Sequence, residues 1–402
     1  MAKIMGVLKL SFTIFLAVII LQGIALSEPL PTDLSHFQIQ LPLKEAPGGV
    51  VTFENGRLAL PGQQSDSSKF TAVIEKSAVA TWRGSKVAAV VLSYSLGGSG
   101  TFKKLYFLSF EDSAWLPKAW FYLGDRPKIR YLSLYRHGTI YLGMIIHKAK
   151  DPACCPTKRV LKIFDVTDMG LKPSGTYPVD LFPDEISCNP ELLGKNAKLE
   201  LIPKVSFSPH AMGPASPIPT HVALILDGKF VPMRVINVEK YIKMWMEHKD
   251  PAINIAITRL KRDLNKDVSS LSPPFDILPP IPGINDFAIY LSHIPFKNGK
   301  GLGFIGRVAK DLSCITASQL RFFYMGLDHK GHYLVTMSKK LQPSSEVVPS
   351  KLWICDGGIS GLQKQIKELG QFFGTIPEEK AFPEMVNLKK FIKGLEIKVV
   401  SE

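Results

Sequence analysis

Short apolar runs separated by turn residues fill residues 70–166 and constrain the fold more than any other feature of the chain. Gly97-Gly98-Ser99-Gly100 separates the first two runs, and His137-Gly138 separates the next two. Short apolar runs bounded by such turns are typical of buried strands joined as hairpins. The runs are residues 86–93, 104–110, 129–135, 140–146 and 160–166. Because no helical period interrupts them, we expect an antiparallel β sandwich or barrel over residues 28–170.

A proline-rich stretch follows at residues 171–220, where Pro173 is the first of nine prolines. Proline fixes φ and removes a backbone donor, so we expect a connector that holds one or two short strands. Beyond it, residues 221–402 show a mixed pattern that predicts an α+β domain, with one antiparallel sheet and packed helices.

Helices and strands alternate unevenly in this C-terminal part. Asn237 is the expected cap of one helix, and Asp250-Pro251 the expected start of another. Two further amphipathic stripes close the chain, one through Leu362, Ile366, Leu369 and Phe373, the other through Met385, Leu388, Phe391, Ile392 and Leu395. The expected strands are residues 222–226, 287–291, 302–308, 320–326 and 333–338.

Residues 1–27 have the pattern of a secretory signal, with basic Lys3 and Lys9, an apolar run over residues 10–26, and small Ala25 and Ser27. We expect cleavage after Ser27 and a destination in the periplasm or outside the cell. The alternative is an uncleaved anchor, since the run is about as long as the shortest bilayer span.

The chain carries 49 Lys and Arg against 35 Asp and Glu, a net charge of +14, which becomes +12 without Lys3 and Lys9. Outside the cytoplasm this charge favours anionic partners, such as acidic envelope polymers. Basic residues recur at 258–266 and 387–398, where a solvated helix face is the ordinary explanation. No basic strip with interleaved aromatics is present, so specific nucleic-acid recognition is not predicted.

Two motifs that resemble ligand sites have simpler explanations. The glycine spacing of residues 301–306 matches dinucleotide sites, but a strand-like run follows the glycines where a helix is required. Asp328, His329 and His332 fit hairpin-turn chemistry better than a metal site, which needs more ligands. No complete catalytic motif occurs, and we predict no metal and no cofactor.

The segment from Asp151 to Thr157 contains adjacent Cys154 and Cys155 and is the most distinctive in the sequence. In an oxidising compartment the two can bond to each other, pair with distant cysteines, or bind a soft metal. A structural lock is the preferred interpretation, and a redox role is the alternative. If they bond to each other, Cys314 with Cys355 is the expected second bridge, and Cys188 is the odd thiol.

Two stretches resemble an uncharacterised family of secreted or envelope proteins of bacteria. The first contains GGSGTF (residues 97–102), LGDR (123–126) and DPACCPT (151–157), and the second runs from about residue 221 to residue 398. The resemblance implies export, a bacterial source and a two-module layout, and it assigns no activity.

These observations lead to three hypotheses about function. The first is a non-catalytic binding protein outside the cytoplasm, whose partner is an anionic envelope polymer or another exported protein. The second is a thiol-disulfide or metal function centred on the adjacent cysteines. The third is electrostatic binding of anionic polymer. For the first two, the expected site consists of Asp125, Arg126, Asp151, Cys154 and Cys155.

Overall fold

The computed structural model describes residues 34, 39–54, 57–59, 70–135, 137–206, 217–226, 229–311 and 313–398. The predicted signal sequence lies outside these residues, and so does Asp227-Gly228, a dipeptide typical of turns that follows the expected strand at residues 222–226. Among the described residues, no helix combines the length and apolar character that a bilayer crossing requires.

Seven strands form the first sheet, in the order β3-β2-β1-β7-β6-β5-β4. Neighbouring strands are antiparallel except β1 and β7, which are parallel. The sheet curls, because side chains of β1 and β5 share one buried cluster and its two end strands, β3 and β4, are in contact. Its strands are β1 (Ile39–Pro42), β2 (Val50–Glu54), β3 (Arg57–Ala59), β4 (Thr71–Trp82), β5 (Ser85–Ser95), β6 (Phe102–Glu111) and β7 (Ala114–Asp125).

Four strands form a second, antiparallel sheet that packs on the first, with the order β11-β10-β9-β8. They are β8 (Lys128–Leu134), β9 (Thr139–Ile146), β10 (Lys158–Thr167) and β11 (Gly170–Pro178). Between the two sheets, Val87, Ala89 and Val91 of β5 pack with Leu142 of β9. The predicted antiparallel β module is therefore confirmed.

Strand β5 explains the unbroken apolar run at residues 86–93. Alternate side chains of a strand point to opposite faces of the sheet. Ala88 and Val90 pack inside the curl with Leu41 of β1, whereas Val87 and Ala89 face the second sheet. Because both faces are buried, both sets of side chains are apolar.

The proline-rich stretch contributes more strand than its composition predicts. It contains most of β11, then β12 (Ile186–Ser187) and β13 (Lys198–Ile202). Strand β11, which contains Pro173 and Pro178, is an edge strand of the second sheet, where proline is tolerated. Strand β13 contains no proline and is an edge strand of the C-terminal sheet. Pro173 lies next to an irregularity in the β10–β11 pairing. The number of prolines alone therefore predicts too few strand residues in this stretch.

The C-terminal sheet is antiparallel and has the order β13-β14-β15-β19-β18-β17-β16. All five predicted strands are present within it. Its remaining strands are β14 (His221–Leu226), β15 (Lys229–Asn237), β16 (Ile284–Phe296), β17 (Gly299–Ala309), β18 (Arg321–Asp328) and β19 (Tyr333–Lys340). A short strand, β20 (Glu396–Ile397), pairs with β12.

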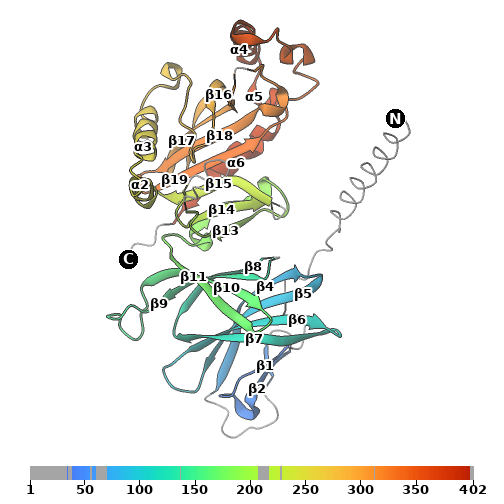
Figure 1. Cartoon of the computed structure of the whole chain (residues 1–402), viewed down its shortest axis with the longest axis vertical. Helices are drawn as coiled ribbons and strands as arrows, with labels where there is room; N and C mark the ends of the chain where they lie inside the picture. Colours follow the sequence, from blue (N-terminus) through green and yellow to red (C-terminus); the bar gives the residue numbers. More distant parts are fainter. Residues whose placement is uncertain are drawn as a thin grey trace, which may run out of the picture.

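Helices cover both faces of this sheet (Figure 1). On one face lie α2 (Val238–Met246) and α3 (Ala252–Asp263); on the other lie α4 (Gly358–Gly374), α5 (Glu378–Ala381) and α6 (Glu384–Gly394). The Asn237 side chain caps α2 by accepting from Lys240 N at 2.9 Å. On β18, Phe322 packs on the α4 side and Phe323 on the α3 side. The predicted α+β architecture is confirmed.

One apolar core joins the two halves of the protein. Leu161 and Ile163 of β10 belong to the same buried cluster as Val222 and Leu224 of β14. Figure 1 shows β4 to β11 below this junction and the C-terminal sheet with its helices above it. The two halves therefore meet along a packed seam.

The glycines at residues 301–306 are packing glycines of β17. A Cβ on Gly301 would lie 2.3 Å from the Tyr324 ring, and one on Gly306 would lie 2.3 Å from Phe287 O. The neighbouring Asp328–His332 segment forms the β18–β19 turn, where Gly331 N donates to Asp328 O at 2.8 Å. The strand at the glycines and the turn at Asp328–His332 were both expected, whereas the close packing of the glycines was not.

Candidate functional site

Arg126 brings together the two turns that the sequence had singled out. Its Nη1 donates to Ala153 O at 2.8 Å, while Nε donates to Ser99 O at 3.1 Å and Nη2 to Ser99 Oγ at 3.2 Å. Beside it, Asp125 Oδ1 accepts from Thr101 N at 3.0 Å. The Gly97–Gly100 turn, the Asp125-Arg126 corner and the cysteine loop therefore meet at one end of the β sandwich.

Asp151 ties the two ends of the cysteine loop together. Its Oδ2 accepts from Lys148 N and from Thr157 N, both at 2.8 Å, and its Oδ1 accepts from Thr157 Oγ1 at 2.9 Å. Hydrogen bonds from the Lys148 and Thr157 backbones hold the pKa of this carboxyl below its usual range. Both carboxylate oxygens are thus used within the loop.

Cys154 and Cys155 are bonded to each other and are exposed at the tip of this loop. Cys314 is bonded to Cys355, whose Cα lies 6.0 Å away. Cys188 is a thiol, and burial raises its pKa to about 11. Such a thiol carries little thiolate at neutral pH and is a poor nucleophile.

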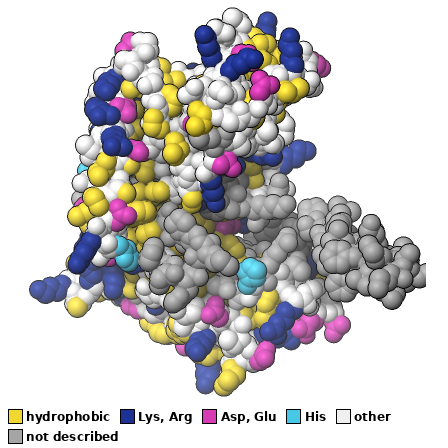
Figure 2. Space-filling view, turned by 45° about the horizontal axis from the view of Figure 1, so that its top comes forward, with side chains coloured by type: hydrophobic (Ala, Val, Ile, Leu, Met, Phe, Trp, Pro, Cys, Tyr) yellow, Lys and Arg dark blue, Asp and Glu magenta, His cyan; other side chains and the backbone are white. Residues whose placement is uncertain are grey.

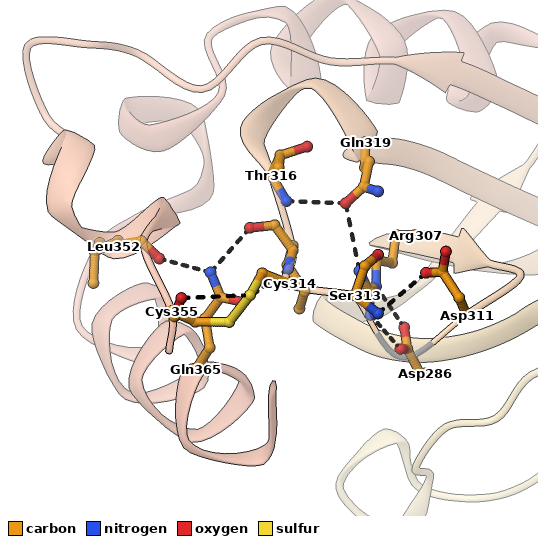
Figure 3. The surroundings of a disulfide bond; sticks show 11 residues. Asp286, Arg307, Asp311, Ser313, Cys314, Thr316, Gln319, Leu352, Cys355 and Gln365 are labelled. Carbon is orange, nitrogen blue, oxygen red and sulfur yellow. Dashed lines mark hydrogen bonds and ion pairs between the residues drawn. A yellow bond between two sulfur atoms is a disulfide. The ribbon is translucent and has the colours of Figure 1, made fainter. Parts of the chain in front are cut away.

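The surroundings of the second disulfide are drawn in Figure 3. Gln365 of α4 accepts from Ile315 N at 2.8 Å and donates to Ile315 O at 2.9 Å and to Leu352 O at 3.1 Å. The disulfide therefore joins the same two segments that the buried Gln365 amide fastens to α4. This arrangement is structural, since Gln365 is 1% exposed and fully engaged.

The five residues expected to form a site lie close together. However, the side chains of Asp125, Arg126 and Asp151 already bind atoms of the neighbouring turns and of the cysteine loop. Arg126 uses three nitrogens on backbone and hydroxyl oxygens, and Asp151 uses both oxygens. This geometry favours the structural lock over a ligand site. No group of three or more His, Cys, Asp or Glu residues in the described part of the chain is placed to hold a metal.

A hollow of about 380 Å³ lies along the seam, next to the base of the cysteine loop. The lower half contributes Lys148, Lys158 and Arg159, and the upper half contributes Lys240 of α2 and Tyr333 of β19. A second hollow of about 230 Å³ shares Lys240 and Pro178 with the first. It adds Lys204, Lys243 and Glu247. We call the two hollows together the seam groove.

Two cations of the seam groove are neutralised by neighbouring carboxylates. Lys240 Nζ lies 2.6 Å from Asp180 Oδ1. Arg159 pairs with Glu185, which also lies 3.5 Å from Arg130 Nη2. Glu185 is 3% exposed and accepts from Phe182 N at 2.8 Å. These pairs hold the segment after β11 against both halves.

Four lysines of the seam groove are exposed and form no ion pair with the described residues: Lys148, Lys158, Lys204 and Lys243. Glu247 is the one acid of the groove without an ion pair in that part of the chain. The Tyr333 hydroxyl lies among them, and burial together with the Asp180 carboxylate raises its pKa to about 12. It is therefore neutral at physiological pH and can donate a hydrogen bond.

The seam groove was not apparent from the sequence. Its unpaired lysines come from the β9–β10 loop, from β10, from the segment after β13 and from α2, and no spacing links them. The basic cluster at residues 258–266, which the sequence did single out, is largely neutralised: Arg259 lies 3.1 Å from Asp276, and Arg262 lies 3.1 Å from Asp263. In Figure 2, Lys and Arg side chains gather at the left edge and at the top of the face shown, with Asp and Glu among them.

No family model matches the chain, and no curated protein sequence matches it significantly. Two solved structures show a weak likeness. One is a levansucrase complexed with sucrose, with 11% identity and a TM-score of 0.20 over 69% of this chain and 72% of that chain. The other is a mannose phosphorylase from Leishmania mexicana in complex with phosphate, with 11% identity and a TM-score of 0.17 over 69% and 77%. TM-scores this low carry no conclusion about fold or function.

Proposed function

We propose that the protein is an exported, non-catalytic binding protein that holds an anionic polymer in the seam groove. The observation that carries this proposal is the set of four exposed, unpaired lysines around two adjoining hollows. Like charges gathered in one groove repel one another, and an anionic ligand relieves that repulsion. An extended ligand fits because the lysines follow the junction across several elements.

Salt-dependent binding of a linear polyanion tests the proposal. We expect dextran sulfate to bind the full chain at low ionic strength and to be released as salt rises, since exposed charges are screened within about 10 Å at 0.1 M salt. The variant K148Q/K158Q/K204Q/K243Q should bind about tenfold or more weakly. Fluorescence anisotropy with labelled polymer measures both effects.

A matched control separates the groove from overall charge. Lys351, Lys364, Lys367 and Lys390 are exposed lysines outside the groove. Their fourfold Gln variant has the same net charge as the groove variant and should bind nearly as well as the natural chain. Equal losses in the two variants would show that binding follows net charge alone and would exclude the groove.

Export is part of the proposal and rests on the pattern of residues 1–27. Expression of the whole chain in a bacterium, followed by fractionation and N-terminal sequencing, should yield protein outside the cytoplasm that begins at Glu28. Retention of residues 1–27 on membrane-bound protein would favour the anchor.

The exposed Cys154–Cys155 bond supports a second function, thiol-disulfide exchange with an external dithiol. In that reaction a thiolate attacks one sulfur, the intramolecular bond breaks, and a second thiolate completes reduction while the dithiol becomes a disulfide. Alkylation and mass spectrometry after mild reduction measure it. Resistance of this bond to mild reductant would leave the structural lock as its role.

A further inference from the structure

A third hollow, of about 480 Å³, lies on the α3 side of the C-terminal sheet and carries an unusual charge distribution. Three segments far apart in sequence meet there: the end of α3, the start of β17 and the β18–β19 turn. They contribute Lys261, Lys300, and His329 with Lys330, respectively. None of its lining residues belongs to the seam groove. We call it the turn hollow.

A hydrogen bond holds the ammonium group of one of these lysines at the end of α3. Lys300 Nζ donates to Asn265 Oδ1 at 2.9 Å, and Asn265 Nδ2 in turn donates to Lys261 O at 3.0 Å. The Lys261 ammonium reaches the turn, since a Cβ built on Gly331 would lie 3.5 Å from Lys261 Nζ. Lys261 of α3 thus reaches the turn, and Lys300 of β17 reaches Asn265 at the end of α3.

The turn itself is fixed by backbone bonds. Gly331 N donates to Asp328 O at 2.8 Å, and His329 N donates to Asn298 O at 2.9 Å. Asp328 Oδ1 accepts from Tyr333 N at 2.6 Å. The position of Lys330 therefore rests on a well-connected hairpin.

The turn hollow has an excess of positive charge. Among the described residues, Lys261, Lys300 and Lys330 form no ion pair. Asp328 is the one acid that lines the hollow, and it is 6% exposed and bonded to the Tyr333 backbone.

A neighbouring hollow offers a direct comparison, because it also borders α3. Its cations are neutralised: Arg259 pairs with Asp276, and Arg262 and Lys266 pair with Asp263. Each cation of that hollow therefore has a carboxylate partner, although Arg262 and Lys266 share one. The three lysines that line the turn hollow form no ion pair with the described residues. Three lysines around one hollow, with the buried Asp328 as the one described acid that lines it, form an arrangement that a compact anion with several charges would neutralise.

We propose that the turn hollow binds a phosphate group, either free or as the monoester of a larger molecule such as a lipid headgroup. Lysine ammonium groups bind phosphate as point charges with several donors, and here they approach from three segments. The Asn265 side-chain oxygen accepts a hydrogen bond from the Lys300 ammonium group and so orients it. This inference concerns a compact anion at a separate site and does not depend on the seam groove.

Titration with inorganic phosphate and pyrophosphate tests the proposal. We expect the full chain to bind pyrophosphate more tightly than phosphate, with a rise in Tm on binding, because only the folded state holds the site. The variant K261Q/K300Q should lose about tenfold or more in affinity and most of the Tm rise. Without ligand, this variant should be at least as stable as the natural chain, since it removes like-charge repulsion.

The seam-groove variant K148Q/K158Q is the matched control, because it has the same net charge as K261Q/K300Q. It should retain pyrophosphate binding, whereas K261Q/K300Q should retain dextran sulfate binding. Equal loss of pyrophosphate binding in both variants, or no binding by the natural chain at millimolar pyrophosphate, would overturn the site without bearing on the groove.

Vesicles separate the two sources of the phosphate group. If a lipid headgroup is the ligand, vesicles containing phosphatidic acid should bind the natural chain and be displaced by pyrophosphate, and K261Q/K300Q should bind them weakly. If the vesicles do not bind while pyrophosphate does, the ligand is a free or water-soluble phosphate.

Discussion

Two buried polar residues show how single side chains set the stability of this fold. His221 is 4% exposed at the start of β14, with Nδ1 2.8 Å from Pro219 O. Burial lowers its pKa to about 4, and the Arg234 guanidinium acts in the same direction. Arg307 of β17 is fully buried and holds Asp286 through Nε at 2.9 Å and Nη2 at 2.6 Å.

His221 predicts a loss of stability in weak acid. Its folded-state pKa lies below the ordinary value of about 6.5, so the unfolded state binds the proton first as pH falls. The contribution of neutral His221 to the free energy of unfolding is complete above about pH 6.5 and declines by up to about 3 kcal/mol as pH approaches 4. Urea unfolding at several pH values measures it. His221→Asn retains a donor for Pro219 O, and its stability should decline less as pH falls. An identical decline in this variant would show that other groups cause the loss of stability.

We expect that breaking the Arg307–Asp286 ion pair strongly destabilises the protein. Arg307→Met leaves the Asp286 carboxylate without its partner and should reduce the free energy of unfolding by about 3–5 kcal/mol. Arg307→Lys retains the charge but not the two-pronged geometry, so we expect an intermediate loss. Denaturant titration of both variants checks the order. A loss in Arg307→Met no greater than that in Arg307→Lys would contradict this account.

At the scale of elements, the two disulfides have different consequences. Cys314–Cys355 closes a loop between cysteines 41 residues apart, and Cys154–Cys155 joins neighbours. Loop-closure entropy predicts that C314S/C355S costs about 4 kcal/mol, whereas C154S/C155S costs little. Arg126 and Asp151 should keep the loop in place in the second variant. Thermal unfolding measures the loss of stability in both variants. A larger loss in C154S/C155S than in C314S/C355S would contradict this account.

The elements differ in how well the sequence predicted them. Strand β5 and the stripes of α4 and α6 were predictable because their burial is continuous or periodic along the chain. Strand β11 was not, since its Pro173 and Pro178 are acceptable only at a sheet edge, and edge position is a property of the assembled sheet. The cysteine loop was recognised from its composition, but its link to Ser99 through Arg126 was not.

At the scale of the whole molecule, the shared core predicts that the two halves unfold together. Leu161 of β10 is fully buried in the cluster that also contains Leu224 of β14. Leu161→Ala should therefore destabilise both halves by about 2–5 kcal/mol through the cavity it leaves. Calorimetry should show one transition that shifts as a unit. Two transitions, of which only one shifts, would show that the halves fold separately.

The sequence by itself determined the β module, the helices and strands of the C-terminal part, and the excess of positive charge, because apolar periodicity and composition are local properties. Only the tertiary structure decided which charges remain unpaired. Arg259 and Arg262 lie in a conspicuous basic run and are neutralised by Asp276 and Asp263, whereas Lys148 and Lys243 are inconspicuous in sequence and stand unpaired in one groove. Charge pairing depends on distances between residues far apart in the chain, and the packing of the two halves sets those distances.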